Sequence, residues 1–339
     1  MNISTKLLKA AAGQAGGAGL DVDEVFSTHL ISGTGSSQTI TNNIDLTEGG
    51  IVWLKGRSAA YDNYIADTVM GVQKHFKVNG PTLENNSDGL TAFNNNGFTI
   101  GSWGDINTSG QTWASWTWRK APKYFDVISY TGNGTAGRTL AHNLECDVGM
   151  IIIHSTANNR AGVVWHKGYS STTQGYTYMN STMAEDLSSN LWNSTAPTSS
   201  AITLGTNSLV NSNGEAYVAY VFAHNNGDGT FGPSGDQDII KCGSISGYNG
   251  RAELGFEPQW VLLKETNYTG NWIILDVMRG WIVGSNNDAH LWANLSNAEA
   301  DYNGPSFDAT GFNYGQSGTN WIYMAIRRGP LAAPTDATK

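Results

Sequence analysis

The 339-residue chain has little charge, little cysteine and no long apolar run. Charged residues make up 14% of it, against about 25% in an average globular protein. Its 19 Lys and Arg residues against 28 Asp and Glu give a formal net charge of −9, which argues against nucleic-acid binding. No stretch approaches the roughly 18–20 apolar residues of a membrane-spanning helix. Two cysteines, Cys146 and Cys242, predict neither a disulfide framework nor a metal cluster, and whether they pair stays open.

Glycine and aromatic residues are abundant instead, with 41 Gly, 12 Trp, 14 Tyr and 10 Phe. Disordered chains are poor in aromatics and rich in charge, so this composition predicts a folded protein with sizeable cores. The exception is the start, residues 1–20, whose residues are too small and too rich in glycine for the apolar region of a signal peptide. We expect these residues to form a flexible arm.

One order of features occurs three times along the chain. Each copy opens with a Gly-rich turn, continues with an apolar strand and closes with a Phe or Ile strand, a polar turn and an aromatic strand. The opening turns are Ser32–Ile40, Tyr130–Leu140 and Ser246–Leu254, the apolar strands are Ile51–Lys55, Met150–His154 and Trp260–Lys264, and the closing modules are Gly97–Pro122, Ala201–His224 and Gly311–Pro330. The period of roughly 100–110 residues exceeds that of solenoid repeats and suits a small β domain.

The aromatic runs of the closing modules have the composition of β-strands: TWASWTW from Thr112, AYVAYVF from Ala216 and WIYMAI from Trp321. Their imperfect alternation predicts strands that are buried on both faces or at an interface. No segment of twelve or more residues has a convincing amphipathic helical pattern. The best short helix candidates are residues 296–300 and their counterpart 183–186.

These patterns predict an all-β protein built from three β-sandwich repeats in tandem. The predicted divisions are the flexible arm 1–20, repeat 1 at 21–122, repeat 2 at 123–235, repeat 3 at 236–330 and a mobile tail at 331–339. Six tryptophans in the strands are predicted to pack in cores or between subunits: Trp113, Trp116, Trp118, Trp260, Trp272 and Trp321.

Several segments resemble a repeat module of virion proteins from marine and cyanobacterial tailed bacteriophages. They are TGNGTAGRTL from Thr131, NSNGEAYVAYVFA from Asn211, GFEPQWVLLK from Gly255 and GNWIILDVMRG from Gly270. The resemblance covers nearly the whole chain and is best in repeat 2. Repeat 3 departs from it, with SGYNG at 246–250 and a shortened closing turn. The resemblance implies lectin-like or jelly-roll-type sandwiches on the virion surface, and it brings no catalytic residues with it.

The resemblance further implies a structural virion protein that is made in the host cytoplasm, as a tail fibre or tail-associated spike. Its sandwiches would stack along a fibre, its partners would be other virion proteins, and a homotrimer follows by analogy with fibres. The arm residues Lys6, Leu7, Leu8 and Lys9 would dock it to the particle. Alternatives are a capsid decoration or head-fibre protein, a glycan-specific adhesin and a polysaccharide depolymerase.

Catalytic and metal chemistry find little support in the sequence, so we predict no enzyme, no metal and no cofactor. The acidic residues that follow the polar, Asn-containing segment of each copy recur in all three and predict a shared solvated turn rather than a glycosidase pair: Glu84, Asp88, Glu185, Asp186, Glu299 and Asp301. The seven histidines are scattered. His154 stands where the other copies have Lys55 and Lys264, which predicts an exposed strand end.

Aromatic residues in polar, Gly/Asn-rich stretches are candidates for stacking on host sugars. They are Trp103, Trp281, Trp292, Tyr302 and Tyr314. Because aromatics are also enriched at interfaces, packing is the competing interpretation and the favoured one.

Overall fold

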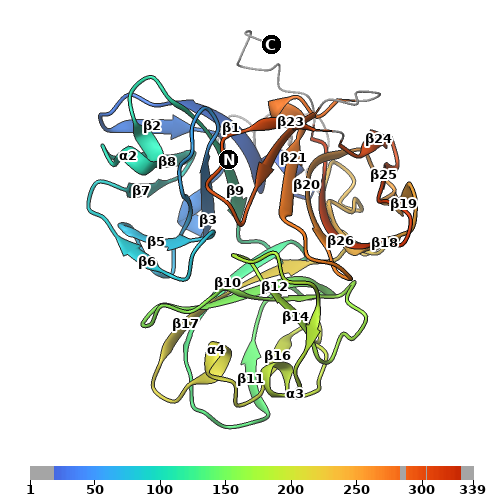
Figure 1. Ribbon diagram of the computed structural model, residues 1–339. Coiled ribbons are helices and arrows are strands. Elements are labelled where there is room, and N and C mark those ends of the chain that lie inside the picture. The colour runs from blue at the N-terminus through green and yellow to red at the C-terminus, as the bar shows by residue number, and fades with distance from the viewer. Residues whose placement is uncertain (1–18, 283–287, 303, 330–339) are drawn as a thin grey trace.

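The computed structural model describes residues 19–282, 288–302 and 304–329, and the fold of these residues is nearly all β (Figure 1). Three lobes surround a common centre (Figure 1). We call them the first lobe (β1 to β9), the second lobe (β10 to β17) and the third lobe (β18 to β26). The arm residues Lys6, Leu7, Leu8 and Lys9 and the predicted tail 331–339 lie outside the described residues.

Each lobe contains a six-stranded antiparallel sheet, and within the described residues the three sheets share one strand order. In the first lobe it is β1 (Phe26–Ser32), β9 (Thr112–Arg119), β3 (Gly50–Gly56), β4 (Asn63–Asp67), β5 (Lys74–Lys77) and β6 (Leu83–Asn85). In the second it is β10 (Phe125–Thr131), β17 (Ala216–Ala223), β12 (Val148–Ser155), β13 (Val163–His166), β14 (Gly175–Tyr178) and β15 (Asp186–Leu187). In the third it is β18 (Ile240–Ser246), β26 (Asn320–Arg327), β20 (Pro258–Glu265), β21 (Trp272–Asp276), β22 (Asp288–Trp292) and β23 (Ala300–Tyr302).

A smaller antiparallel sheet accompanies each large one. These small sheets are β2 (Gln38–Thr41), β8 (Gly97–Ile100) and β7 (Leu90–Asn94); β11 (Arg138–Ala141) and β16 (Ala201–Leu204); and β19 (Gly250–Glu253), β25 (Gly311–Tyr314) and β24 (Ser306–Asp308). Helical segments in the described residues are short: α2 (Gly104–Asn107), α3 (Ser189–Trp192), α4 (Ser208–Asn211) and the 3-10 turns η1 (Val22–Glu24), η2 (Leu46–Glu48) and η3 (Val277–Arg279).

The large sheets are buried on both faces, which explains the imperfect alternation of their strands. Along β3, Val52 and Leu54 pack into the first lobe's own core against its small sheet. Ile51 and Trp53 point the other way, into an apolar core that includes residues of all three lobes. Because successive side chains of a strand point to opposite faces, every position of such a strand is covered by protein.

Trp118 lies where the three lobes meet. Its ring centroid is 5.0 Å from that of Phe26 in the same lobe, 6.0 Å from Phe222 of the second lobe and 5.3 Å from Trp260 of the third. The lobes therefore surround one shared core rather than follow one another in a row, as stacking along a fibre had predicted. The six strand tryptophans are all buried inside this single chain, none more than 8% exposed: Trp113, Trp116, Trp118, Trp260, Trp272 and Trp321.

The two short helices that we expected at 183–186 and 296–300 are not formed. Both segments run as extended chain that binds the next lobe. The backbone N–H of Glu185 donates to the carbonyl of Thr266 at 2.8 Å, and that of Glu299 donates to the carbonyl of Arg57 at 2.8 Å. Hydrogen bonds to another lobe thus replace the intrahelical ones.

Candidate functional site: the junctions between lobes

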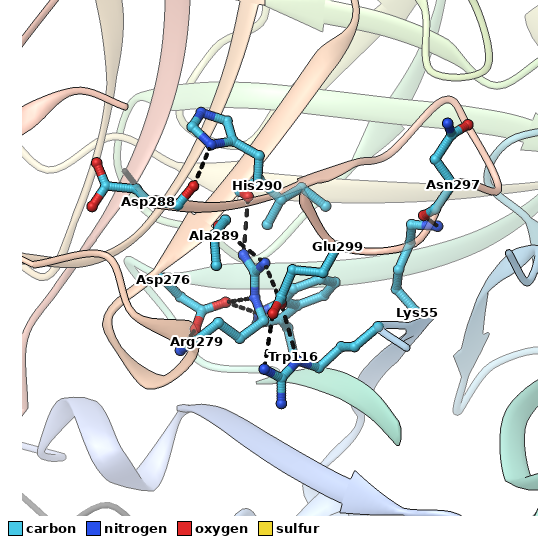
Figure 2. Close-up of polar contacts among 11 residues, drawn as sticks. Lys55, Trp116, Asp276, Arg279, Asp288, Ala289, His290, Asn297 and Glu299 are labelled. Carbon is cyan, nitrogen blue, oxygen red and sulfur yellow. Dashed lines mark hydrogen bonds and ion pairs between the residues drawn. The ribbon is translucent and has the colours of Figure 1, made fainter. Parts of the chain in front are cut away.

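A buried ion pair lies at the junction of the first and third lobes (Figure 2). Arg279, at the end of η3, and Asp276, at the end of β21, are both fully buried, and the Arg279 Nε lies 2.6 Å from the Asp276 Oδ2. The same carboxylate accepts the backbone N–H of Arg279 at 2.9 Å and the indole N–H of Trp116, from the first lobe, at 2.9 Å. Asp276 therefore joins two lobes through one side chain.

Glu299 extends this network. It lies 3.2 Å from the Arg279 guanidinium, and it receives two hydrogen bonds from Arg57 of the first lobe, at 2.9 and 3.0 Å. Burial acts to raise the pKa of Glu299, but the hydrogen bonds and charges of Arg57 and Arg279 outweigh it and hold that pKa below its ordinary value. Two guanidinium groups and two carboxylates are thus paired at the junction, and the Arg57–Glu299 pair crosses it.

A corresponding hydrogen bond joins the second lobe to the first. The pairing registers place Tyr220 of β17 at the position that Trp116 has in β9, and Asp67 of β4 at the position of Asp276 in β21. The Tyr220 hydroxyl donates to the Asp67 Oδ2 at 2.8 Å. Both junctions therefore use an aromatic donor and an acidic acceptor at equivalent positions.

The junction of the second and third lobes has different residues at these two positions. Met324 stands at the position of Trp116 and Tyr220 and has no donor. The position of the acid is occupied by His166, whose Nε2 donates to the backbone carbonyl of Tyr323 at 3.1 Å. Each lobe thus contacts both others, and the contacts close into a ring.

One strand position in each lobe places a cationic or imidazole side chain at a junction. Lys55, His154 and Lys264 follow the inward-pointing residues of β3, β12 and β20 by two positions, and all three are at most 1% exposed. The prediction of an exposed strand end at His154 is therefore wrong. Period-two alternation directs these side chains into the molecule, where a neighbouring lobe covers them.

The contacts of these residues cross the junctions. The Lys55 Nζ donates to the carbonyl of Asn297 at 3.1 Å, and the Lys264 Nζ donates to the carbonyl of Thr182 at 3.4 Å. The imidazole of His154 stacks on Phe76 of the first lobe, with centroids 3.9 Å apart. Burial lowers the pKa of Lys264 to about 8 and that of His154 to about 4.

Lys55 provides a test of this burial. Burial lowers its pKa from 10.5 to about 7, with Asp62 opposing and Arg279 adding to the shift. A lysine with a lower pKa in the folded state binds fewer protons there, so stability rises with pH between the two values. We expect the free energy of unfolding to rise between pH 7 and 9 more steeply in the wild type than in Lys55→Met, as measured by urea denaturation. The exposed Lys74→Met should keep the wild-type slope, and equal slopes in the wild type and Lys55→Met would contradict the assignment.

The five aromatics that we proposed as sugar contacts do not form one platform. Trp281 is fully buried, packs on Phe307 with centroids 4.5 Å apart, and donates its indole N–H to the carbonyl of Pro305. The expectation that it contacts sugar is wrong, because a core side chain has no free ring face. Trp103 is half-buried against Tyr64 in the first lobe, with centroids 4.6 Å apart.

The other three lie in the third lobe. Trp292 and Tyr302 pack edge to face at 5.3 Å, with Tyr302 53% exposed. Tyr314 is half-buried and packs against Trp321 at 4.9 Å, beside a pocket that Tyr248 also lines. Tyr248 is 81% exposed and was missed, although its place in the divergent SGYNG turn was a usable signal.

The recurring acids belong in part to the junctions rather than to solvated turns. The carboxylate of Glu299 is 11% exposed and paired with arginine. Glu185 accepts hydrogen bonds from the Ser170 backbone N–H at 3.0 Å and its hydroxyl at 2.7 Å. Of these two carboxylates, Glu299 pairs across a junction, whereas Glu185 binds within its own lobe.

The part of the chain that the structure describes contains no cluster of three or more His, Cys, Asp or Glu residues suited to a metal ion. In those same residues no helix is long and apolar enough to cross a membrane. Cys146 and Cys242 are both buried, free thiols, and burial raises the pKa of Cys146 to about 12.

Comparison with known proteins gives one match. The sequence model described as Domain of unknown function (DUF7483) matches residues 21–330, a range that takes in all three lobes. No curated protein and no solved structure matches the chain. The chain belongs to the DUF7483 family.

Proposed function

We propose that this protein is a structural component of a tailed-bacteriophage virion, used as a tail fibre or tail-associated spike. The observation that supports the proposal is the closed ring of lobes around one core. The charged groups Arg57, Asp276, Arg279 and Glu299 are paired inside the ring, where they hold lobes together. A rigid, low-charge β assembly of this kind suits a particle part, and it adds to the sequence resemblance described above.

We further infer that the lobes are tandem copies of one lectin-like β-sandwich module. The shared strand order, the small sheet packed on each large one and the equivalent junction contacts support this interpretation. The homotrimer stays a prediction. It rests on the analogy with fibres, and the strand tryptophans that were candidates for packing between subunits are buried within one chain, so subunit contacts would have to use other surfaces.

Deleting residues 2–19 tests the proposed docking. We expect a chain that folds as the wild type does but no longer joins particles, because the family match begins at residue 21, after this segment. The measurement is immunoblotting of purified particles produced with the variant gene, and deletion of residues 331–339 is the matched control. Normal incorporation without residues 2–19 would show that the arm is not the anchor. Labelling of intact particles separates tail from head, and a label on the head would assign capsid decoration instead.

A further inference from the structure

The third lobe lacks a segment that the other two lobes share. The register of the small sheets and of the long strands makes three segments equivalent: 101–113, 205–217 and 315–321. The first two contain thirteen residues each and the third contains seven, so the third is six residues shorter. This is the shortened closing turn of the sequence.

In the first two lobes the additional residues fill the end of the sandwich. They form the short helical turns α2 and α4, each of which buries an aliphatic side chain and an asparagine completely: Ile106 and Asn107, and Val210 and Asn211. The asparagine side chain accepts the backbone N–H of the facing turn, from Thr34 in one lobe and Asn133 in the other, both at 2.9 Å. This hydrogen bond thus holds the helical turn against the facing turn.

A pocket occupies the corresponding place in the third lobe. Its volume is about 300 Å³, and its lining includes Tyr248, Asn249, Ser306, Tyr314, Gln316 and Trp321. Tyr248 stands at the position of Thr34 and Asn133, where it extends into solvent, 81% exposed. Trp321 is 8% exposed, whereas its counterparts Trp113 and Tyr217 are at most 1% exposed under their helical turns. The pocket therefore results from the missing six residues.

The chemistry of the lining combines ring faces with neutral polar groups. Tyr314 and Trp321 pack edge to face, with centroids 4.9 Å apart and planes at 72°, and Tyr248 adds an exposed third ring. Amides of Asn249 and Gln316 supply donors and acceptors. The lining contains no charged side chain. A phosphate or carboxylate ligand would lack a partner of opposite charge here.

The Arg251 guanidinium beside the pocket is already paired with carboxylates. Arg251 reaches the pocket residue Asn313 at 3.1 Å, but it forms ion pairs with Asp308 at 2.8 Å and Glu253 at 3.1 Å. A ligand suited to this site must present apolar faces to aromatic rings and hydroxyls to amides, while carrying no charge. Pyranose rings have both features, since their axial C–H groups form an apolar face and their hydroxyls lie around the edge.

We propose that this pocket of the third lobe binds a neutral saccharide, with Tyr248 as its exposed stacking face. The volume is at the lower end of the range for small-ligand pockets, about 300–1,000 Å³, which suits one or two sugar rings. The site goes beyond the structural role proposed above, because it does not depend on where the protein lies in a particle.

Saccharide binding by the purified full chain tests the proposal. The probes are glucose, galactose, mannose and N-acetylglucosamine with their short oligomers, measured by saturation-transfer NMR and calorimetry. We expect at least one to bind, and Tyr248→Ala to weaken its binding about tenfold or more. Tyr248 is exposed, so the variant should fold. Tyr268→Ala, which removes another exposed tyrosine of the same lobe, 60% exposed, is the matched control and should bind as the wild type does.

A second variant fills the pocket. Inserting the sequence TNSLVN of residues 206–211 after Gly315 restores the second lobe's turn and should abolish binding while the thermal unfolding transition is retained. Absence of binding by the whole panel, or binding unchanged in Tyr248→Ala, would overturn the proposal. Particle incorporation is measured separately, so failure of one proposal leaves the other intact.

Discussion

Replacing Arg279 with methionine is expected to lower the free energy of unfolding by about 3–5 kcal/mol. The variant leaves the Asp276 carboxylate buried at the junction with its cationic partner removed. Hydrogen bonds from Trp116 and the backbone do not replace the guanidinium charge. Methionine keeps much of the aliphatic volume, so the loss reports on the guanidinium itself, both its charge and its hydrogen bonds to the carbonyls of Ile274 and Ala289. Urea denaturation at pH 7, followed by circular dichroism, gives the difference.

Two further variants make this result specific. Arg251→Met removes an arginine of the same lobe whose partner Asp308 is exposed, and its effect should be far smaller because water replaces the lost partner. Adding Asp276→Asn to Arg279→Met should recover part of the lost stability, because the double variant no longer buries an unpaired carboxylate charge. A loss in Arg279→Met no greater than in Arg251→Met would show that the ion pair does not hold the lobes.

The strands were predictable from local patterns. Residues 51–55, 150–154 and 260–264, predicted as apolar strands, lie within β3, β12 and β20. Turns rich in Gly and Asn and runs of aromatic and β-branched residues act over a few positions, so one sequence carries the signal. The nearly all-β character follows from these signals alone.

What covers each face was not predictable in the same way. Lys55 ends the apolar run IVWLK, and a lysine at that place is typical of a strand that leaves a core for solvent. The third lobe nevertheless covers it. Trp281 stands in a Gly-rich stretch that resembles a surface loop, but Phe307, 26 positions later, packs on its ring. Contacts across such sequence distances depend on how lobes close on one another, which local periodicity does not contain.

The pocket shows the opposite case, in which the signal was present. The shortened closing turn and the SGYNG sequence marked the third copy as divergent. Tyr314 lies in a polar, Gly/Asn-rich stretch and was a candidate on that ground, and Tyr248 lies in the divergent turn itself, where the same criterion applies. Aligning the copies by strand register shows where in the third lobe the six residues are missing.

Replacing Trp118 with alanine is expected to destabilise all three lobes together, by about 3–5 kcal/mol. Its fully buried ring contacts Phe26, Phe222 and Trp260, one in each lobe, so its removal leaves a cavity that no single lobe can close. The indole N–H of Trp118 has no hydrogen-bond partner in the structure, so the loss is one of packing and apolar burial.

Hydrogen exchange gives the measurement that distinguishes a shared core from three separate ones. If the core is shared, amide protection in β3, β12 and β20 falls by the same free energy in Trp118→Ala, because opening any lobe exposes the core of the others. A second variant is Trp281→Ala, which removes an equally buried indole from the third lobe's own core. If the lobes open together, it too lowers protection equally in all three strands, whereas lobes that open separately would lose protection in β20 alone. Loss of protection confined to β3 in Trp118→Ala would mean that the lobes unfold independently. The ring would then be an arrangement of three stable sandwiches, and the buried charges at the junctions would orient lobes that need no help to fold.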